Sequence, residues 1–244
     1  MAITVPRHEF ITLLGGAMLL AVSTAGPAAG QTAVDLDLVL AVDASRSVDA
    51  TRFELRRRGD VAAFRSGQVL EAIRGGANQS IAVAMVQWTG PRLQAQIVPW
   101  AVVKDQASAN SVATLIENTP RRLFNGGTSI SGAIDYAMKW FTQDPFKTDR
   151  HVIDVSGDGS NNSGRSITGA RDEAVAAGVV INGLPILAWE PNLDEYYKTN
   201  VIGGPGAFMV VAESFDTFAD AILKKMIIEI AAAPSPRRHT ALAE

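Results

Sequence analysis

The hydrophobic positions of the chain form two short apolar runs that each lead towards an aspartate. The first runs from Leu38 to Val42 and is followed directly by Asp43; the second, from Val152 to Ser156, is apolar apart from Asp154 and Ser156 and leads to Asp158. A strand that is apolar on both faces is typical of the interior of a parallel sheet. Because open α/β sheets bind ligands at the carboxyl ends of their strands, we expect both aspartates to lie at the ligand-binding edge.

The rest of the pattern alternates strands with amphipathic helices. Strands are predicted over residues 81–88, 95–103, 179–186 and 207–211, and helices over 50–64, 105–118, 130–141, 167–177 and 215–230. Asp49 is expected to cap the first helix, and Pro99 places its strand near an edge of the sheet, in an antiparallel pair. This alternation predicts an α/β fold that is doubly wound, with a mostly parallel central sheet, one antiparallel edge strand and helices on both faces.

The amino-terminal end of the chain differs in composition from the part that follows. Arg7 and His8 precede an uncharged apolar stretch at residues 11–22, and small residues follow as far as Gly30. The stretch is shorter than the roughly 20 residues that span a bilayer, so residues 1–30 are predicted to be a signal peptide. Residues 31–232 are then expected to form one domain and residues 233–244 a flexible tail, in a periplasmic or secreted protein without a membrane span after signal removal.

The charge balance favours no nucleic-acid partner, since 22 lysines and arginines stand against 25 acidic residues. A local basic cluster of Arg52, Arg56, Arg57 and Arg58 falls in the helix predicted over 50–64. We expect these arginines to point outward as a solvated face without a function. The chain has no cysteine, which removes disulfides, thiolate catalysis and zinc–thiolate sites.

Three loops carry the oxygen donors that make a metal site a candidate. Asp43, Ser45 and Ser47 follow the first strand, Thr128 stands in a glycine turn that enters a helix, and Asp158 follows the second strand. In a doubly wound fold these loops converge on one edge, and a hard cation such as Mg²⁺ prefers about six oxygen ligands. Taken alone, the aspartate and serines after the first strand are also explained by helix capping and turn formation.

At this point the chain resembles the von Willebrand factor type A (VWA) domain, whose metal-ion-dependent adhesion site (MIDAS) combines Asp-x-Ser-x-Ser with a threonine and a later aspartate. The resemblance implies a Rossmann-like fold in which Ser45, Ser47 and Thr128 give hydroxyl ligands to Mg²⁺ or Mn²⁺. It implies that Asp43 and Asp158 act partly through bound water and that one coordination position is left for an acidic side chain of a protein or peptide partner. Residues 181–186 and 200–208 are similar to an exported bacterial VWA family whose function is not established.

The sequence favours a binding protein and not an enzyme. Its three histidines are His8, His151 and His239, and none is placed to form a serine triad at the predicted metal edge. The catalytic alternative is a haloacid-dehalogenase-like, Mg²⁺-dependent phosphoryl hydrolase, because residues 157–162 resemble the magnesium loop of that family. Two acidic positions of that family are Ser45 and Asn162 here, so a general acid and a metal ligand would be missing. A structural domain with an unused metal site is the other alternative.

Several polar and aromatic residues near the predicted edge are left outside the proposed site. Asp154 lies inside a buried strand and needs a hydrogen-bonding partner, so we expect it to be structural. Trp88 is expected to be a packing residue, whereas Tyr196 and Tyr197 are compatible with either packing or ligand contact. Asn161 and Asn162 are interpreted as turn formers.

Overall fold

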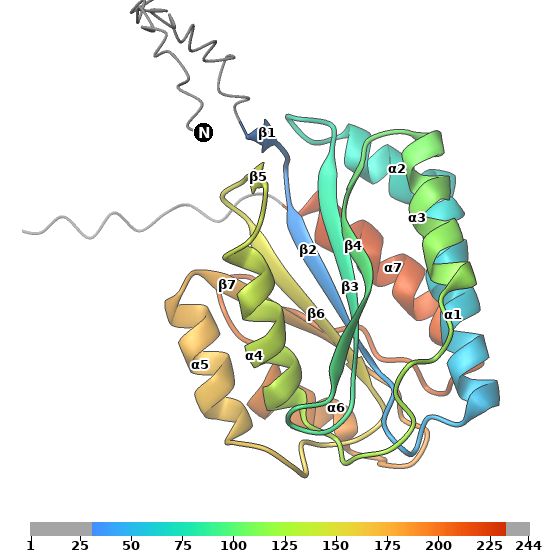
Figure 1. Cartoon of the computed structure of the whole chain (residues 1–244), viewed down its shortest axis with the longest axis vertical. Coiled ribbons are helices and arrows are strands. Elements are labelled where there is room, and N and C mark those ends of the chain that lie inside the picture. The colour runs from blue at the N-terminus through green and yellow to red at the C-terminus, as the bar shows by residue number, and fades with distance from the viewer. Residues whose placement is uncertain (1–30, 233–244) are drawn as a thin grey trace, which may run out of the picture. The chain divides into compact units, whose positions relative to one another are not determined.

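The computed structural model describes residues 31–232, which include the whole predicted VWA domain. The predicted signal peptide and tail lie outside the described residues. In the described part, a five-stranded sheet has the strand order β4-β3-β2-β6-β7 (Figure 1). Its strands are β2 (Asp37–Asp43), β3 (Ile81–Trp88), β4 (Gln94–Val103), β6 (His151–Gly157) and β7 (Val179–Pro185). All neighbouring strands are parallel except β3 and β4, so the predicted fold class is confirmed.

Helices cover both faces of this sheet. They are α1 (Ala50–Arg65), α2 (Gly67–Arg74), α3 (Gln106–Asn118), α4 (Ile130–Phe141), α5 (Ile167–Ala176), α6 (Leu193–Tyr196), a π-helical turn η1 (Tyr197–Val201) and α7 (Phe218–Ala231). A two-stranded parallel sheet pairs β1 (Thr32–Ala33) with β5 (Phe146–Lys147). None of the helices in residues 31–232 has the length and apolar character needed to cross a membrane.

The central strand β2 explains why the fold has two cores. All seven of its residues are buried, and successive side chains point to opposite faces. Leu38 and Leu40 belong to the core beneath α1 and α7, whereas Val39 and Ala41 belong to the core beneath α4 and α5. A strand buried on both faces has no polar side, which is why the run was recognisable in the sequence.

Element boundaries agree with the predicted order but differ in detail. Pro99 lies in β4, which is the antiparallel edge strand expected for it. Residues 207–211 do not form the predicted strand: Met209 and Ala212 make only isolated bridges, to Gly183 and Ile186. A second helix, α2, follows α1 after Ser66, whose side chain caps it by accepting a hydrogen bond from the backbone of Gln68.

Candidate metal centre

The loop after β2 is folded by its own polar side chains. Oδ1 of Asp43 accepts a hydrogen bond of 2.6 Å from the backbone N–H of Ser45, which closes a tight turn directly after the strand. The hydroxyls of Ser45 and Ser47 lie 3.1 Å apart. Asp49 then caps α1 by accepting a bond from the backbone of Arg52, as predicted. The turn therefore leaves the two serine hydroxyls side by side immediately before the helix.

The loop after β6 meets this turn. Because β2 and β6 are parallel neighbours, their carboxyl ends lie at the same edge of the sheet, and the hydroxyl of Ser47 donates a hydrogen bond of 2.5 Å to Oδ1 of Asp158. Asp43, Ser45 and Asp158 are buried, and Ser47 is half-buried. We call the loops of residues 43–49, 124–129 and 158–165 the rim. Four of the five predicted ligands are thus connected there by a continuous chain of polar contacts.

Thr128 reaches the rim from the loop that precedes α4. Its backbone carbonyl accepts bonds from the N–H groups of Asn162 and Ser163, and its own N–H donates to the side chain of Asn162. A Cβ atom at Gly159 would lie 3.6 Å from the Thr128 hydroxyl oxygen. That hydroxyl therefore faces the residue next to Asp158. Gly126 allows the approach, since its φ of +117° suits only glycine and a Cβ there would meet the Thr89 hydroxyl at 2.8 Å.

Two carboxylate oxygens of the rim are buried without a hydrogen bond among the described residues, namely Oδ2 of Asp43 and Oδ2 of Asp158. Burial raises the pKa of Asp43 to about 7, and the negative charge of Asp158 adds to this rise against the bonds from Ser45 and the charge of Arg56. Burial also raises the pKa of Asp158. Buried oxygens without partners are costly, and a divalent cation is the kind of group that would satisfy them. The all-oxygen set of Asp43, Ser45, Ser47, Thr128 and Asp158 therefore fits Mg²⁺ or Mn²⁺.

Three arginines that lie outside the first rim loop donate hydrogen bonds to its backbone. Arg56 donates to the carbonyl of Asp43 at 2.9 Å, Arg121 donates to the carbonyls of Ala44 and Ser45, and Arg52 donates to the carbonyl of Ser47 at 2.7 Å. Guanidinium groups therefore bind the backbone carbonyls of this loop, and the side-chain hydroxyls of Ser45 and Ser47 remain as its oxygen donors. The prediction of an outward, solvated arginine face is wrong for Arg56, which is 3% exposed.

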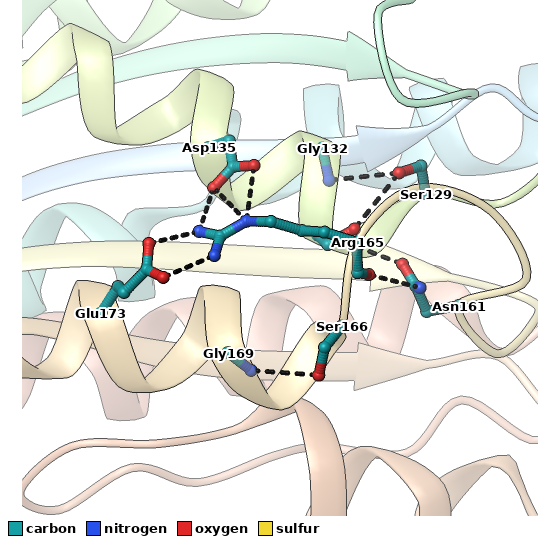
Figure 2. A network of polar contacts seen from close by, with 9 residues as sticks. Ser129, Gly132, Asp135, Asn161, Arg165, Ser166, Gly169 and Glu173 are labelled. Atoms are coloured by element: carbon teal, nitrogen blue, oxygen red, sulfur yellow. Dashed lines mark hydrogen bonds and ion pairs between the residues drawn. The ribbon is translucent and has the colours of Figure 1, made fainter.

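The third rim loop is fastened at its far end by Arg165. Figure 2 shows its guanidinium lying between Asp135 of α4 and Glu173 of α5, with bonds to both carboxylates. These two acids raise the pKa of Arg165 above its usual value. In the same network Asn161 accepts a bond from the backbone of Ser131 and donates to the carbonyl of Arg165. The loop that carries Asp158 is therefore attached to both helices on that face of the sheet.

The residues left outside the predicted site have structural contacts. Asp154 forms a 2.7 Å ion pair with Lys225 of α7, and Trp88 is fully buried, which agrees with the roles expected for both. Tyr197 is fully buried as well, so it packs beneath the rim. The Tyr196 hydroxyl accepts a bond from the backbone of Asn161.

Sequence reasoning missed two residues that contact the rim. Arg121 follows the proline that ends α3, and no periodicity or motif in that loop indicates a contact with Ala44. Glu190 accepts a bond of 2.8 Å from the backbone of Ser160, and its Oε2 would lie 3.8 Å from a Cβ at Gly159. Both contacts join segments far apart in the sequence, so only the folded chain reveals them.

Residues 33–234 match the family described as "Protein of unknown function (DUF1194)". The chain belongs to this family. No curated protein matches the DUF1194 chain. Solved structures that resemble it include proximal thread matrix protein 1 from the mussel byssus with a zinc-occupied MIDAS motif, at a TM-score of 0.59 and 16% identity over 82% of this chain and 46% of that chain. Another is a pilus adhesin, SpaC from Lactobacillus rhamnosus GG, at a TM-score of 0.59 and 17% identity over 82% of this chain and 31% of that chain.

A von Willebrand factor type A protein from Catenulispora acidiphila gives a TM-score of 0.57 and 17% identity over 82% of this chain and 43% of that chain. At these identities the likeness shows a shared fold, and the DUF1194 chain spans less than half of each of these longer chains. The VWA fold implied by the sequence resemblance is therefore confirmed. Metal binding by the five rim residues stays a prediction.

Proposed function

We propose that this chain binds a divalent cation, Mg²⁺ or Mn²⁺, through Asp43, Ser45, Ser47, Thr128 and Asp158, and uses it to recognise an acidic group of a protein or peptide partner. The observation that carries the proposal is the pair of buried carboxylate oxygens, Asp43 Oδ2 and Asp158 Oδ2, that have no hydrogen bond among the described residues. The nearby hydroxyls are neutral oxygen donors, so a bound cation would keep much of its charge for a ligand.

The charge of the surroundings favours an acidic partner over a basic one. Arg52, Arg56 and Arg121 contact the first rim loop, so three positive charges lie against the three rim carboxylates Asp43, Asp49 and Asp158. A divalent cation added to this set gives a positive rim, and such a field attracts acidic ligands and raises their association rate. The pilus adhesin and the mussel byssus protein are consistent with an adhesive role, which for this chain is part of the proposal.

The same proposal includes export, because residues 1–30 have the charge, apolar and small-residue order of a signal peptide. The mature protein would then act in the periplasm or outside the cell. Amino-terminal sequencing of the protein from a periplasmic fraction tests this directly. A first residue near Gln31 supports export, and an intact amino terminus in the cytoplasm contradicts it.

The test of binding has two stages. Calorimetric titration of the metal-free chain with Mg²⁺ and with Mn²⁺ is expected to give one site that Ser45→Ala or Asp158→Asn abolishes, while the exposed Ser111→Ala leaves it unchanged. Peptide arrays are then probed in Mg²⁺ and in chelator, with pairs of peptides that differ only by Glu against Gln. Loss of the Glu preference on chelation supports the proposal, and no metal binding at all overturns it.

The same protein samples also test the two alternative functions, a phosphoryl hydrolase and a structural domain with an unused metal site. A phosphoryl hydrolase would release phosphate from p-nitrophenyl phosphate in Mg²⁺, and Asp43→Asn would stop it. Asn162, which stands where that family has an acid, has its side-chain oxygen engaged by the backbone N–H of Thr128, which disfavours catalysis at this loop. A structural domain with an unused site would bind metal and show no difference between the paired peptides.

A further inference from the structure

A second group of metal-ligating side chains lies at the opposite edge of the sheet from the rim. Asp37 and His151 are the first residues of β2 and β6, and the parallel register pairs them directly. Asp144 joins them from the loop between α4 and β5. One ligand atom of each of these three residues lies within 4.8 Å of the others.

The aspartate at the centre of this group is buried and without a hydrogen bond. Asp37 is 0% exposed, and neither of its carboxylate oxygens has a hydrogen-bond partner among the described residues. Its Oδ2 lies 3.1 Å from Nδ1 of His151, which is an ion pair when the imidazole is protonated, although the two atoms are not in hydrogen-bond geometry. A buried carboxylate of this kind needs a compensating positive charge, which a metal ion, a protonated imidazole or a proton can supply.

The distances suit ligands that share an ion. With metal–ligand bonds of about 2.0–2.1 Å, adjacent ligand atoms of an octahedral or tetrahedral zinc site lie roughly 2.8–3.4 Å apart. The separation of Asp37 Oδ2 and His151 Nδ1 falls in that interval. His151 and Asp144 are both half-buried, so an ion and a water ligand have access from solvent on their side.

The surroundings hold the three ligands in place. The His151 ring packs against Phe141 at 5.1 Å between ring centroids, and Trp100 packs against both Phe141 and Phe146. Oδ1 of Asp144 accepts a bond of 2.9 Å from the backbone of Phe146, which fixes the loop that presents it. Apolar packing and outer hydrogen bonds of this kind orient the ligands of metal sites.

We propose that Asp37, Asp144 and His151 form a second cation site, which takes a borderline divalent ion of the zinc class. One imidazole nitrogen with two carboxylates suits Zn²⁺ better than Mg²⁺, whereas the all-oxygen rim suits Mg²⁺. The site is independent of the function proposed for the rim, because it shares no residue with it and lies at the other end of β2 and β6. Its competitor is a proton shared between Asp37 and Asp144.

Imidazole nitrogen NMR of the purified chain provides the test, because the chain has only three histidines. The metal-free protein is held in excess Mg²⁺ to occupy the rim and is titrated with Zn²⁺, with calorimetry on the same samples. The expected result is a large shift of the His151 ring nitrogens at one equivalent of Zn²⁺. His151→Gln and Asp144→Asn are each expected to weaken that binding by more than about tenfold.

His8 and His239 supply the matched control, since His8→Gln with His239→Gln removes every other imidazole and is expected to leave the affinity unchanged. Asp144→Asn keeps an acceptor for the backbone of Phe146, so it tests the ligand without removing that bond. Thermal unfolding in chelator shows that each variant is folded. A His151 signal that does not move with Zn²⁺ overturns the proposal, as does zinc binding that survives both single variants.

Discussion

The hydroxyl of Ser47 donates a hydrogen bond to Oδ1 of Asp158, a residue 111 positions further along the chain. This contact joins the loop after β2, which begins with Asp43, to the loop after β6, which begins with Asp158. The loops that carry Ser45 and Asp158 are therefore held together by a side-chain contact between them.

Ser47→Ala tests that contact. The variant leaves Oδ1 of Asp158 without its donor, so we expect a loss of about 1–3 kcal/mol in the free energy of unfolding in chelator. We also expect Mg²⁺ to raise the melting temperature of the wild type and to raise that of the variant much less, because a ligand stabilises only the state that binds it. Thermal unfolding with and without Mg²⁺ measures both effects. Equal Mg²⁺ shifts in the two proteins would contradict a ligand role for Ser47.

Arg56→Met tests the buried guanidinium beneath the rim. It removes the donor to the carbonyl of Asp43 and leaves Asp60, which is 2% exposed, without its positive neighbour. Leaving this buried carbonyl without its donor is expected to cost about 1–3 kcal/mol. Arg58→Met is the matched control two residues away, on the exposed side of α1, and is expected to change stability by less than about 0.5 kcal/mol. Urea unfolding compares the two, and similar losses would show that the position of Arg56 is unimportant.

Asp60 gives the protein a pH dependence of known sign. Burial raises its pKa to about 7, against the lowering effect of Arg56, from the value of 3.8 expected when exposed. The folded state therefore binds a proton more tightly than the unfolded state, so this group stabilises the fold below pH 4 and loses that contribution as the pH rises to 7. Asp60→Asn is expected to flatten the slope of unfolding free energy against pH between these values. The exposed Asp172→Asn should leave the slope as it is.

Lys225→Met tests the charge that α7 buries against the sheet. The ammonium of Lys225 is 0% exposed and pairs with Asp154 at 2.7 Å and Glu229 at 3.3 Å. Without it, two carboxylates are buried with no cation, and the expected loss is about 3–5 kcal/mol. Lys224→Met, at the exposed neighbouring position, is the control. Chemical unfolding of both variants gives the measurement, and a stable Lys225→Met protein would mean that the pair contributes little.

The sequence predicts the fold well where one local signal is enough. The apolar run that ends at Asp43 indicates a central strand, and Pro99 indicates an edge. The same strands predict where the rim loops lie. Parallel strands end at one edge of the sheet, so motifs that follow their carboxyl ends must lie at that edge. The positions of Asp43, Ser47 and Asp158 are therefore close to what the motif implies.

The sequence does not predict the side-chain contacts between segments that are distant along the chain. The arginines of α1 are expected to form a solvated face, and only the folded chain shows that Arg56 is buried and bonded to the carbonyl of Asp43. The pairing of Asp154 with Lys225 is of the same kind: the buried aspartate indicates that a partner exists but not which residue it is. Residues 207–211 have the composition of a strand, yet Met209 makes a single bridge to Gly183. Tertiary context decides each of these.

The ion pair of Lys225 with Asp154 also restricts how the last helix can move. Asn182 of β7 donates a 2.7 Å bond to Glu229, so α7 is attached by charged and polar groups to two adjacent strands. Sliding the helix along its axis by one turn, about 5.4 Å, would separate the ammonium from Asp154 while both remained in an apolar environment. The sheet therefore specifies a single axial register for this helix. One polar side chain in a coiled coil specifies the alignment of its helices in the same way.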